Sequence, residues 1–341
     1  MILVAPDSFK GTLTSSEVAM AVADGLREAG VEAIDLCPVA DGGEGTLSAL
    51  AMAWPLELRR LTVNDPLGRP VAAEFGFVPG QGRRGAVAVI EMAAASGLAL
   101  VGSAERDAMA ASSFGTGELI AAAAAAGAGE IYVGLGGSAT TDGGAGAVEA
   151  IRAAGGLEGV RLAVLCDVRT PFEDAAKVFA PQKGASPAQV RELRRRLDRL
   201  AGRLSRDPRG RPLTGAAGGL SGALWAEFGA NLAPGAAFVL NAIGFDRRAT
   251  GARAVITGEG RLDRQSLAGK AVSEVATRAR QSGVPCYAVV GGNELDAFGQ
   301  RILDLMEVLE AGNRRELRQA GMGLAGRLTA ERPRDARRGG G

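Results

Sequence analysis

Five carboxylates lie near the ends of predicted strands, in glycine-rich segments. They are Asp41, Asp142, Asp167, Glu259 and Asp263. One or two carboxylates at such a place can hold a Mg²⁺ ion beside substrate phosphates, and another can serve as a general base. Helix capping and pairing with arginine are the structural alternatives for each of them. We predict that Asp142 and Asp167 share the roles of Mg²⁺ ligand and catalytic base.

Lysine is rare in this chain, and its positions are informative. Basic residues number 39, yet the lysines are only Lys10, Lys177, Lys183 and Lys270. All but Lys177 lie beside glycine, in the sequences FKG, QKG and GKA. A compact ammonium charge next to glycine suits a phosphate or a carboxylate, although an ordinary loop cation gives the same pattern. We predict that Lys10, Lys183 and Lys270 bind substrate or phosphate and that Lys10 also acts in catalysis.

The composition narrows the chemistry further, because the chain contains no histidine. Ser-His-Asp and Cys-His nucleophile systems, histidine-ligated zinc and imidazole bases are therefore excluded for this chain alone. Carboxylates, lysine, arginine, hydroxyls and backbone amides remain. This set suits phosphoryl transfer, in which positioning and charge neutralisation supply most of the catalysis.

These residues need a framework, and the hydrophobic pattern predicts one. Short apolar segments alternate with amphipathic ones, which is typical of an α/β protein whose mostly parallel sheets are covered by helices. A capping box formed by Thr14 and Glu17 predicts that the first helix begins there. Further helices are predicted over 117–126, 144–154, 187–204, 269–281 and 315–328. Strands are predicted over 2–5, 33–37, 86–90, 131–135, 162–166, 254–257 and 286–290.

Nearly every glycine-rich segment directly follows a predicted strand. Examples are PVADGGEGT, GLGGSATTDGGAG and TGEGRLDRQS. Loops at the carboxyl ends of parallel strands line the ligand crevice of such proteins, so we expect these segments to face one shared cleft. Glycine there lets backbone N–H groups approach an anion, although tight turns between strand and helix need glycine as well.

The segment GLGGSA allows a second interpretation. Gly134, Gly136 and Ala139 match a dinucleotide fingerprint, so a nicotinamide-dependent oxidoreductase is the alternative function. No acidic residue closes a clear second strand at the expected distance, and the loop is more polar than a pyrophosphate turn requires. The Walker pattern is absent, because Lys270 is followed by Ala271. We interpret the segment as a phosphate or nucleotide loop of another kind; a non-catalytic protein that binds small anions is a third reading.

Length, charge and cysteine content exclude several other classes. The 341 residues are long enough for two α/β domains. Basic and acidic residues balance at 39 and 38 and aromatic residues are few, which argues against a nucleic-acid partner. The sequence has neither a signal peptide nor an apolar run of membrane-spanning length, so we expect a cytoplasmic protein. Cys37, Cys166 and Cys286 form no metal or disulfide pattern and are expected to fill the core.

Eight sequence blocks, in order, give the chain a family resemblance. The blocks are PDSFKGTLTSSEVA, PVADGGEGT, EMAAASGL, SSFGTGELI, GLGGSATTDGGAG, CDVRTP with FAPQKGA, GAAGGLSGAL, and TGEGRLDRQS with GK. Together they resemble the type I glycerate kinases over roughly residues 1–330. The family's usual glycine and proline are replaced by Arg264 and Val272, but the carboxylates are in place.

The resemblance implies a kinase that uses ATP and Mg²⁺ to phosphorylate D-glycerate. The product in this family is generally 2-phosphoglycerate, and 3-phosphoglycerate stays open. The resemblance also implies two α/β domains with a substrate cleft between them, one of them built from both chain ends. We place this discontinuous domain at 1–70 and 275–341 and the middle domain at 71–274. A homodimer is left open.

The blocks and loops together define a set of expected binding residues. We predict that substrate or phosphate is bound by residues from four of these loops and by the lysines beside glycine: Asp7, Ser8, Lys10, Asp41, Gly42, Gly43, Gly136, Gly137, Ser138, Lys183, Glu259, Arg261 and Lys270. The metal, Mg²⁺, is assigned to Asp142 and Asp167.

Overall fold

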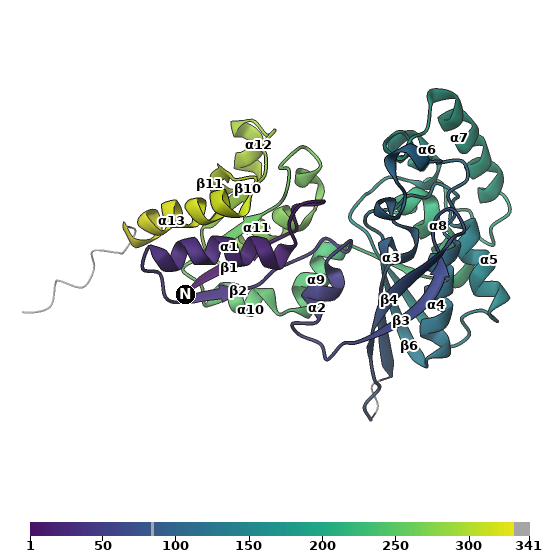
Figure 1. Ribbon diagram of the computed structural model, residues 1–341, viewed down its shortest axis with the longest axis horizontal. Helices are drawn as coiled ribbons and strands as arrows, with labels where there is room; N and C mark the ends of the chain where they lie inside the picture. Colours follow the sequence, from purple (N-terminus) through teal and green to yellow (C-terminus); the bar gives the residue numbers. More distant parts are fainter. Residues whose placement is uncertain (83–84, 331–341) are drawn as a thin grey trace, which may run out of the picture. The chain divides into compact units, whose positions relative to one another are not determined.

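A computed structural model describes residues 1–82 and 85–330 of the chain. Contacts between Cα atoms divide the chain into two compact units (Figure 1). The terminal unit contains Met1–Ala40 and continues from Leu240, and the middle unit is Asp41–Val239. Both boundaries come earlier in the chain than 70/71 and 274/275, the positions expected from the sequence.

The terminal unit is built on a parallel sheet with the strand order β11-β10-β9-β1-β2. Strand β9 lies between β1 and β10, with Ile2 paired with Ala254 and Cys286 with Val255. A boundary after residue 274 would therefore separate β9 from both of its neighbours, and for this reason the unit begins again at Leu240. The strands are β1 Ile2–Pro6, β2 Ile34–Leu36, β9 Ala254–Gly258, β10 Cys286–Val290 and β11 Leu305–Glu310.

Helices cover both faces of this sheet, as the alternation of side chains along a strand requires. Tyr287 and Val289 of β10 pack in a core with apolar residues of α1 (Ser15–Glu28) and α13 (Arg314–Ala330). Ala288 and Val290 pack in a second core that includes Val272 of α11 (Ala271–Gln281). Figure 1 shows α1 and α13 side by side. The remaining helices are α10 Phe245–Thr250, η6 Ser266–Ala268 and α12 Ala297–Ile302.

The middle unit has a mixed sheet with the order β3-β4-β5-β6-β7-β8. Its strands from β5 to β8 are parallel, whereas β3 and β4 form an antiparallel hairpin that continues antiparallel to β5. The expected boundary at 70/71 falls just inside β4 and would split seven of the eight paired positions of this hairpin, from Glu57 with Phe77 to Val63 with Val71. The strands are β3 Glu57–Asn64, β4 Pro70–Val78, β5 Ala86–Glu91, β6 Ala128–Gly134, β7 Arg161–Leu165 and β8 Asn231–Ala233.

The middle unit's helices pack into two apolar cores. The larger core joins the sheet to Leu119 and Ile120 of α4 and to Ile151 of α5. The smaller core joins Phe172 to Leu193 and other residues of α7. The helices are α2 Thr46–Leu50, α3 Ala93–Ser96, η1 Leu98–Leu100, η2 Ser103–Glu105, α4 Phe114–Ala125, α5 Ala145–Ala153, η3 Phe172–Asp174, α6 Ala175–Phe179, η4 Pro181–Lys183, α7 Pro187–Ala201, η5 Ala216–Gly219 and α8 Leu220–Phe228. Helix α9, Gly235–Ala242, contains the unit boundary after Val239.

Most sequence predictions of secondary structure are confirmed. Each predicted strand is present within a few residues, and the two sheets flanked by helices confirm the α/β fold. The predicted capping box is formed: Glu17 N–H donates to the Thr14 hydroxyl at 3.2 Å, and Thr14 N–H donates to the Glu17 carboxylate at 2.8 Å. All three cysteines are buried, as expected of core residues. Over the described residues, no helix has the length and apolar character needed to cross a membrane.

Candidate active site

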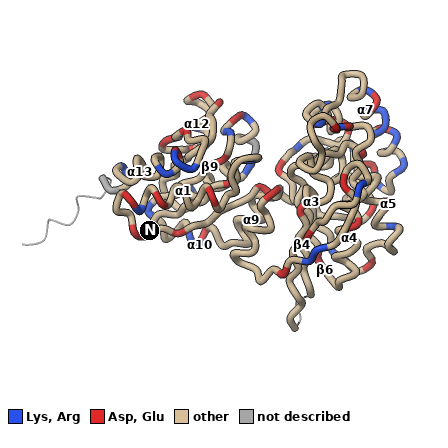
Figure 2. Tube along the Cα trace, viewed as in Figure 1, with Lys and Arg blue, Asp and Glu red and all other residues tan. Residues whose placement is uncertain are grey.

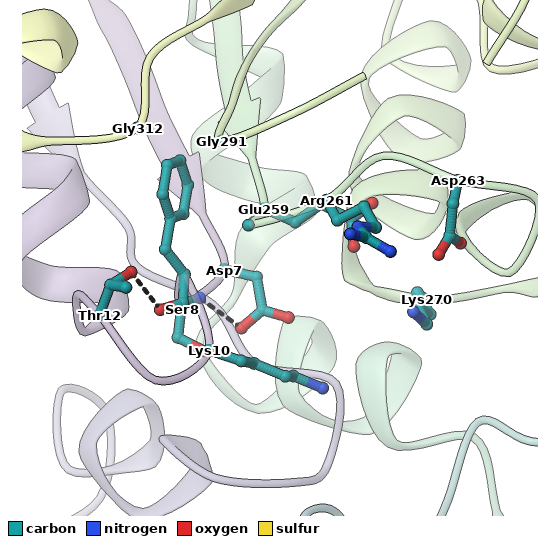
Figure 3. Close-up of a pocket in the computed structure, with 12 residues that line it drawn as sticks. Asp7, Ser8, Lys10, Thr12, Glu259, Arg261, Asp263, Lys270, Gly291 and Gly312 are labelled. Carbon is teal, nitrogen blue, oxygen red and sulfur yellow. Dashed lines mark hydrogen bonds between the residues drawn. The ribbon is translucent and has the colours of Figure 1, made fainter. Parts of the chain in front are cut away.

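A cavity of about 390 Å³ opens at the carboxyl edge of the terminal unit's sheet (Figure 3). Its lining contains several of the residues predicted to bind substrate, drawn from the loops that follow β1 and β9. These residues are Asp7, Ser8, Lys10, Glu259, Arg261 and Lys270. Phe9, Thr12, Gly260, Asp263, Gly291 and Gly312 complete the lining.

Strand order explains why these loops meet. Strands β1, β9, β10 and β11 are neighbouring and parallel, so their carboxyl ends lie at one edge of the sheet. Backbone hydrogen bonds tie the loops together there: Asp7 N–H donates to the carbonyl of Gly258 at 2.8 Å, and Gly291 N–H donates to the carbonyl of Glu259 at 3.1 Å. Within this unit, the loops that follow β1, β9 and β10 therefore lie together at one sheet edge, as expected for segments that follow parallel strands.

The cavity is lined by both signs of charge. Lys10, Arg261 and Lys270 supply positive charge, a combination suited to a carboxylate or a phosphoryl group. Asp7 accepts a hydrogen bond from its neighbour Ser8 N–H at 2.6 Å. Asp263 accepts from the N–H of Gln265 at 2.7 Å and therefore shapes its own loop. Sequence analysis did not assign Thr12 to the site; its position two residues after Lys10 was the available signal.

Two oxygen atoms of this cavity's residues are buried without a hydrogen-bond partner among the described residues. They are Oε1 of Glu259 and Oγ of Ser8. Leaving a buried polar atom unsatisfied costs about 1–3 kcal/mol. Glu259 is only 8% exposed, and burial raises the pKa of its carboxyl group. The Ser266 hydroxyl and the positive charges of Lys270 and Lys10 lower this pKa, and Asp263 raises it.

In the middle unit, the carboxylate of Asp142 is fully engaged by the protein. Its Oδ2 accepts from the N–H of Ser113 at 2.9 Å, from the Ser113 hydroxyl at 2.8 Å and from the N–H of Gly146 at 3.2 Å. Its Oδ1 accepts from the N–H of Gly144 at 3.1 Å. Asp142 thus joins the loop before α4 to the first turn of α5. This donor set is that of a structural anchor.

Asp167 follows β7 and receives hydrogen bonds from the start of a helix. Gly235 N–H donates to its Oδ1 at 2.7 Å, and Ala236 N–H donates to its Oδ2 at 3.1 Å. Both donors belong to the first turn of α9, where a carboxylate also interacts favourably with the helix dipole. Each oxygen accepts one of these bonds.

The glycine loops of the middle unit pack against one another. A Cβ atom at Gly136 would lie 2.5 Å from the Cα of Gly43, and one at Gly42 would lie 2.8 Å from the Cα of Gly235. These glycines are needed because two backbones meet, whether or not an anion binds. Asp41 contributes to the same packing, since its carboxylate accepts from Gly43 N–H at 3.1 Å. Gly137 differs: its φ of +72° is left-handed, and its nearest neighbour would be the Cβ of Ala93 at 3.4 Å.

Lys183 lies beneath the loop that was expected to bind phosphate. It is 2% exposed and donates to the carbonyl of Thr140 and, at 3.3 Å, to the hydroxyl of Ser138. Burial lowers the pKa of its ammonium group to about 7, with the charge of Asp142 acting in the opposite direction. Lys183 is therefore positioned to support the loop from inside, whereas Lys10 and Lys270 line an open cavity.

A second cavity, of about 300 Å³, lies beside the same loop. Thr141 and Asp142 line it together with Arg196, Arg199 and Arg203. Figure 2 shows basic residues along α7, the helix that carries the first two of these arginines. Sequence analysis did not single them out, because an arginine-rich helix usually presents such residues to solvent. Among the described residues there is no group of three or more Asp, Glu, Cys or His side chains arranged to hold a metal ion.

An α/β fold with several cations lining a cavity at a sheet edge is compatible with a phosphotransferase, and comparisons with known proteins name the family. The model of the glycerate kinase family matches residues 2–156 and 152–320. The glycerate 2-kinase of Escherichia coli is 40% identical over 326 residues, covering 85% of this chain and 84% of that protein. A glycerate kinase of Halalkalibacterium halodurans is also 40% identical, covering 85% of each chain.

A solved structure agrees with these matches. The crystal structure of a protein assigned as glycerate kinase 2 from Salmonella typhimurium LT2 superposes with a TM-score of 0.78 at 36% identity, covering 96% of this chain and 98% of that one. The chain belongs to the glycerate kinase family. This membership decides against the nicotinamide-dependent oxidoreductase, and the backbone contact of Gly136 with Gly43 gives the GLGGSA glycines a packing role.

Proposed function

We propose that this protein transfers the γ-phosphoryl group of ATP to a hydroxyl of D-glycerate in a Mg²⁺-dependent reaction, and that the product is 2-phosphoglycerate. The observation that carries this proposal is the cavity of the terminal unit, where Lys10, Arg261 and Lys270 meet carboxylates at one sheet edge. A small hydroxy acid offers an anionic group to the cations and hydroxyl groups to the carboxylates. Family membership and the name of the Escherichia coli relative support the same reaction.

In this proposal the terminal unit binds glycerate. The ammonium of Lys10 and the charges of Arg261 and Lys270 hold the substrate carboxylate and the transferred phosphoryl group, because charge-assisted hydrogen bonds are the stronger ones. Asp7 and Ser8 orient the hydroxyl groups. Transfer of a phosphoryl group needs such positioning more than it needs covalent chemistry from the protein.

The middle unit contributes the loop at Gly137 and Ser138 as a phosphate-binding segment. Lys183 supports this loop through Ser138 and Thr140 rather than by touching phosphate. Gly42, Gly43 and Gly136, with Asp41, form the backbone packing that holds the neighbouring loops in place.

The carboxylates differ in how well they suit Mg²⁺. Asp142 does not fit, because one of its oxygens already accepts three hydrogen bonds. Asp167 does fit, because carboxylate oxygens accept more than one bond each and Mg²⁺ needs only one or two carboxylates beside substrate phosphates. When bound, Mg²⁺ neutralises the negative charge of the phosphates.

An ADP-release assay with D-glycerate, followed by phosphorus NMR of the product, tests the proposal. We expect glycerate-dependent ADP release that ceases when Mg²⁺ is chelated, and a 2-phosphoglycerate spectrum. Release of ADP with another small hydroxy acid but not with glycerate would overturn the substrate. A 3-phosphoglycerate spectrum would overturn only the position of transfer.

A further inference from the structure

We propose that Glu259 is the catalytic base of this enzyme: its carboxylate accepts the proton of the glycerate hydroxyl that attacks the γ-phosphoryl group. This inference rests on the proposed function and adds the residue that performs its proton transfer. Sequence analysis counted Glu259 among five strand-end carboxylates that could serve as ligand or base, but it assigned those roles to Asp142 and Asp167 and gave Glu259 a binding role.

The unsatisfied oxygen of Glu259 is the first observation. Oε1 is buried and has no hydrogen-bond partner in the described part of the chain, although its residue lines the substrate cavity. A buried acceptor without a donor is unusual in a protein and calls for an explanation. A hydroxyl group of the substrate is a donor of the kind that this oxygen lacks, and because Oε1 is buried, the side chain must rotate toward the cavity to accept from it.

The surroundings of Glu259 keep it suited to this task. The same cavity is lined by Lys10 and Asp7 from the loop after β1, and by Arg261, Asp263 and Lys270 from the loop after β9. Burial raises the pKa of the Glu259 carboxyl, and the two lysines limit this rise. A base whose pKa lies nearer neutrality than that of an ordinary glutamate takes up a proton more readily while it is still ionised at working pH.

The competing carboxylates are occupied by the protein. Asp142 accepts four hydrogen bonds from backbone and hydroxyl donors, and Asp167 accepts from two backbone N–H groups at the start of α9. A carboxylate that already stabilises two loops would have to release them to take a proton. Glu259 has no such duty at Oε1.

The proposed step is balanced as follows. The substrate hydroxyl oxygen forms a bond to the γ-phosphorus of ATP while its proton moves to the Glu259 carboxylate. The bond between the γ-phosphorus and the bridging oxygen breaks, and ADP leaves with that electron pair. The proton on Glu259 is then released to water, which restores the ionised carboxylate.

The test compares Glu259→Gln with a matched variant, Glu91→Gln. Glu91 is a partly buried glutamate at the end of a strand, and desolvation raises the pKa of its carboxyl to about 7, but its Oε1 accepts from Leu47 N–H at 2.7 Å. We expect Glu259→Gln to lower kcat by about 10²-fold or more, as loss of a general base does, with little change in the KM for ATP or in the Mg²⁺ requirement. Glu91→Gln should keep kcat within about threefold, because it touches no part of the cavity.

The pH profile separates a base from a merely structural residue. The wild-type kcat should fall as pH decreases through the raised pKa of Glu259, because protonation removes the acceptor, and this acid limb should be absent in Glu259→Gln. Glu259→Asp, which keeps the carboxylate on a shorter side chain, should recover part of kcat together with the limb. It also serves as the test if the Gln variant does not fold.

Three results with Glu259→Gln would overturn the inference, and a fourth comes from its comparison with Glu91→Gln. They are a Glu259→Gln kcat above about a tenth of the parental value, an unchanged acid limb, or an effect that excess Mg²⁺ restores, since the last marks a metal ligand. Equal losses of kcat in Glu259→Gln and Glu91→Gln would also overturn it, because the loss would then follow from changing a poorly exposed glutamate and not from removing a base. Failure of the proposed function is recognised separately, because the wild-type protein itself would then release no ADP with glycerate.

Discussion

The carboxylates of the two units are used in opposite ways. In the middle unit, Asp142 accepts four hydrogen bonds and holds two loops together. In the terminal unit, Glu259 lies at a cavity with one buried oxygen unsatisfied. Position after a strand is common to both, so position alone does not distinguish an anchor from a reactive group. The number of hydrogen bonds that the described residues supply differs between the two carboxylates.

The lysines show the same difference. Lys10 lines the open cavity of the terminal unit, whereas Lys183 is buried beneath a loop of the middle unit. Both lie beside glycine in the sequence, and both were expected to contact substrate or phosphate. The comparison therefore predicts that the cavity residues govern turnover and that the buried residues govern stability.

Lys10→Met is expected to give the largest effect of the predictions that follow. Removing a charge that acts on the substrate or the phosphoryl group should lower kcat/KM by about 10²-fold or more. Lys177→Met is the matched control, because Lys177 is an exposed lysine of α6 outside the glycine loops. Steady-state kinetics of both variants decide the matter. Small and equal losses of kcat/KM in the two variants would contradict the role of Lys10 in turnover.

Asp142→Asn should affect stability more than catalysis. The substituted amide would turn an N–H₂ group toward donors such as Ser113 N–H and Gly146 N–H, and leaving buried groups unpaired costs about 1–3 kcal/mol. Chemical denaturation should show this loss in the free energy of unfolding, while kcat/KM of the folded protein stays above about a tenth of the parental value, a loss under roughly 1.4 kcal/mol. An Asp142→Asn variant that is as stable as the parent but inactive would indicate that Asp142 acts in catalysis.

Asp167→Asn sharpens the contrast between the two middle-unit aspartates. If Asp167 holds Mg²⁺, the variant should need a higher Mg²⁺ concentration for half-maximal rate, and its kcat should recover when Mg²⁺ is raised. Titration of the rate with Mg²⁺ measures this, with Asp142→Asn as the control that should show no such shift. An unchanged Mg²⁺ requirement would leave Asp167 as the N-terminal cap of α9.

Lys183 should change how the free energy of unfolding depends on pH. Its pKa is lowered to about 7 in the folded protein, whereas the unfolded chain has the ordinary value near 10.4. Between these values the unfolded state binds more protons, so this residue makes the free energy of unfolding rise as pH increases from about 7 to about 10. Below pH 7 both states are protonated and its contribution is constant.

Denaturation of wild-type protein and Lys183→Met at several pH values measures this dependence. The difference between their free energies of unfolding should change across the alkaline window and stay level below it. The difference cancels other groups that titrate in the same range, such as the cysteines. A constant difference would show that the lysine is not held in a buried, destabilised charge state.

Local sequence patterns determined a large part of this protein. The apolar strands, the Thr14–Glu17 capping box and the glycine segments after strands all depend on residues close together in the chain, so periodicity and spacing were enough to predict them. The ordered blocks were enough to indicate the family, and the family match confirms it. The hairpin β3–β4 was not predicted, because β3 lacks an apolar run and carries charged residues on an exposed edge.

Only the tertiary structure decided which residues are engaged. The partners of Asp142 and Asp167 include Ser113 and Gly235, 29 and 68 residues away, and the Thr140 carbonyl that Lys183 contacts is 43 residues away. Hydrogen bonds over such separations depend on strand order, which also placed β9 between β1 and β10 and set the unit boundary. A sequence shows that a carboxylate follows a strand. Whether donors reach that carboxylate depends on distant segments that only folding brings near.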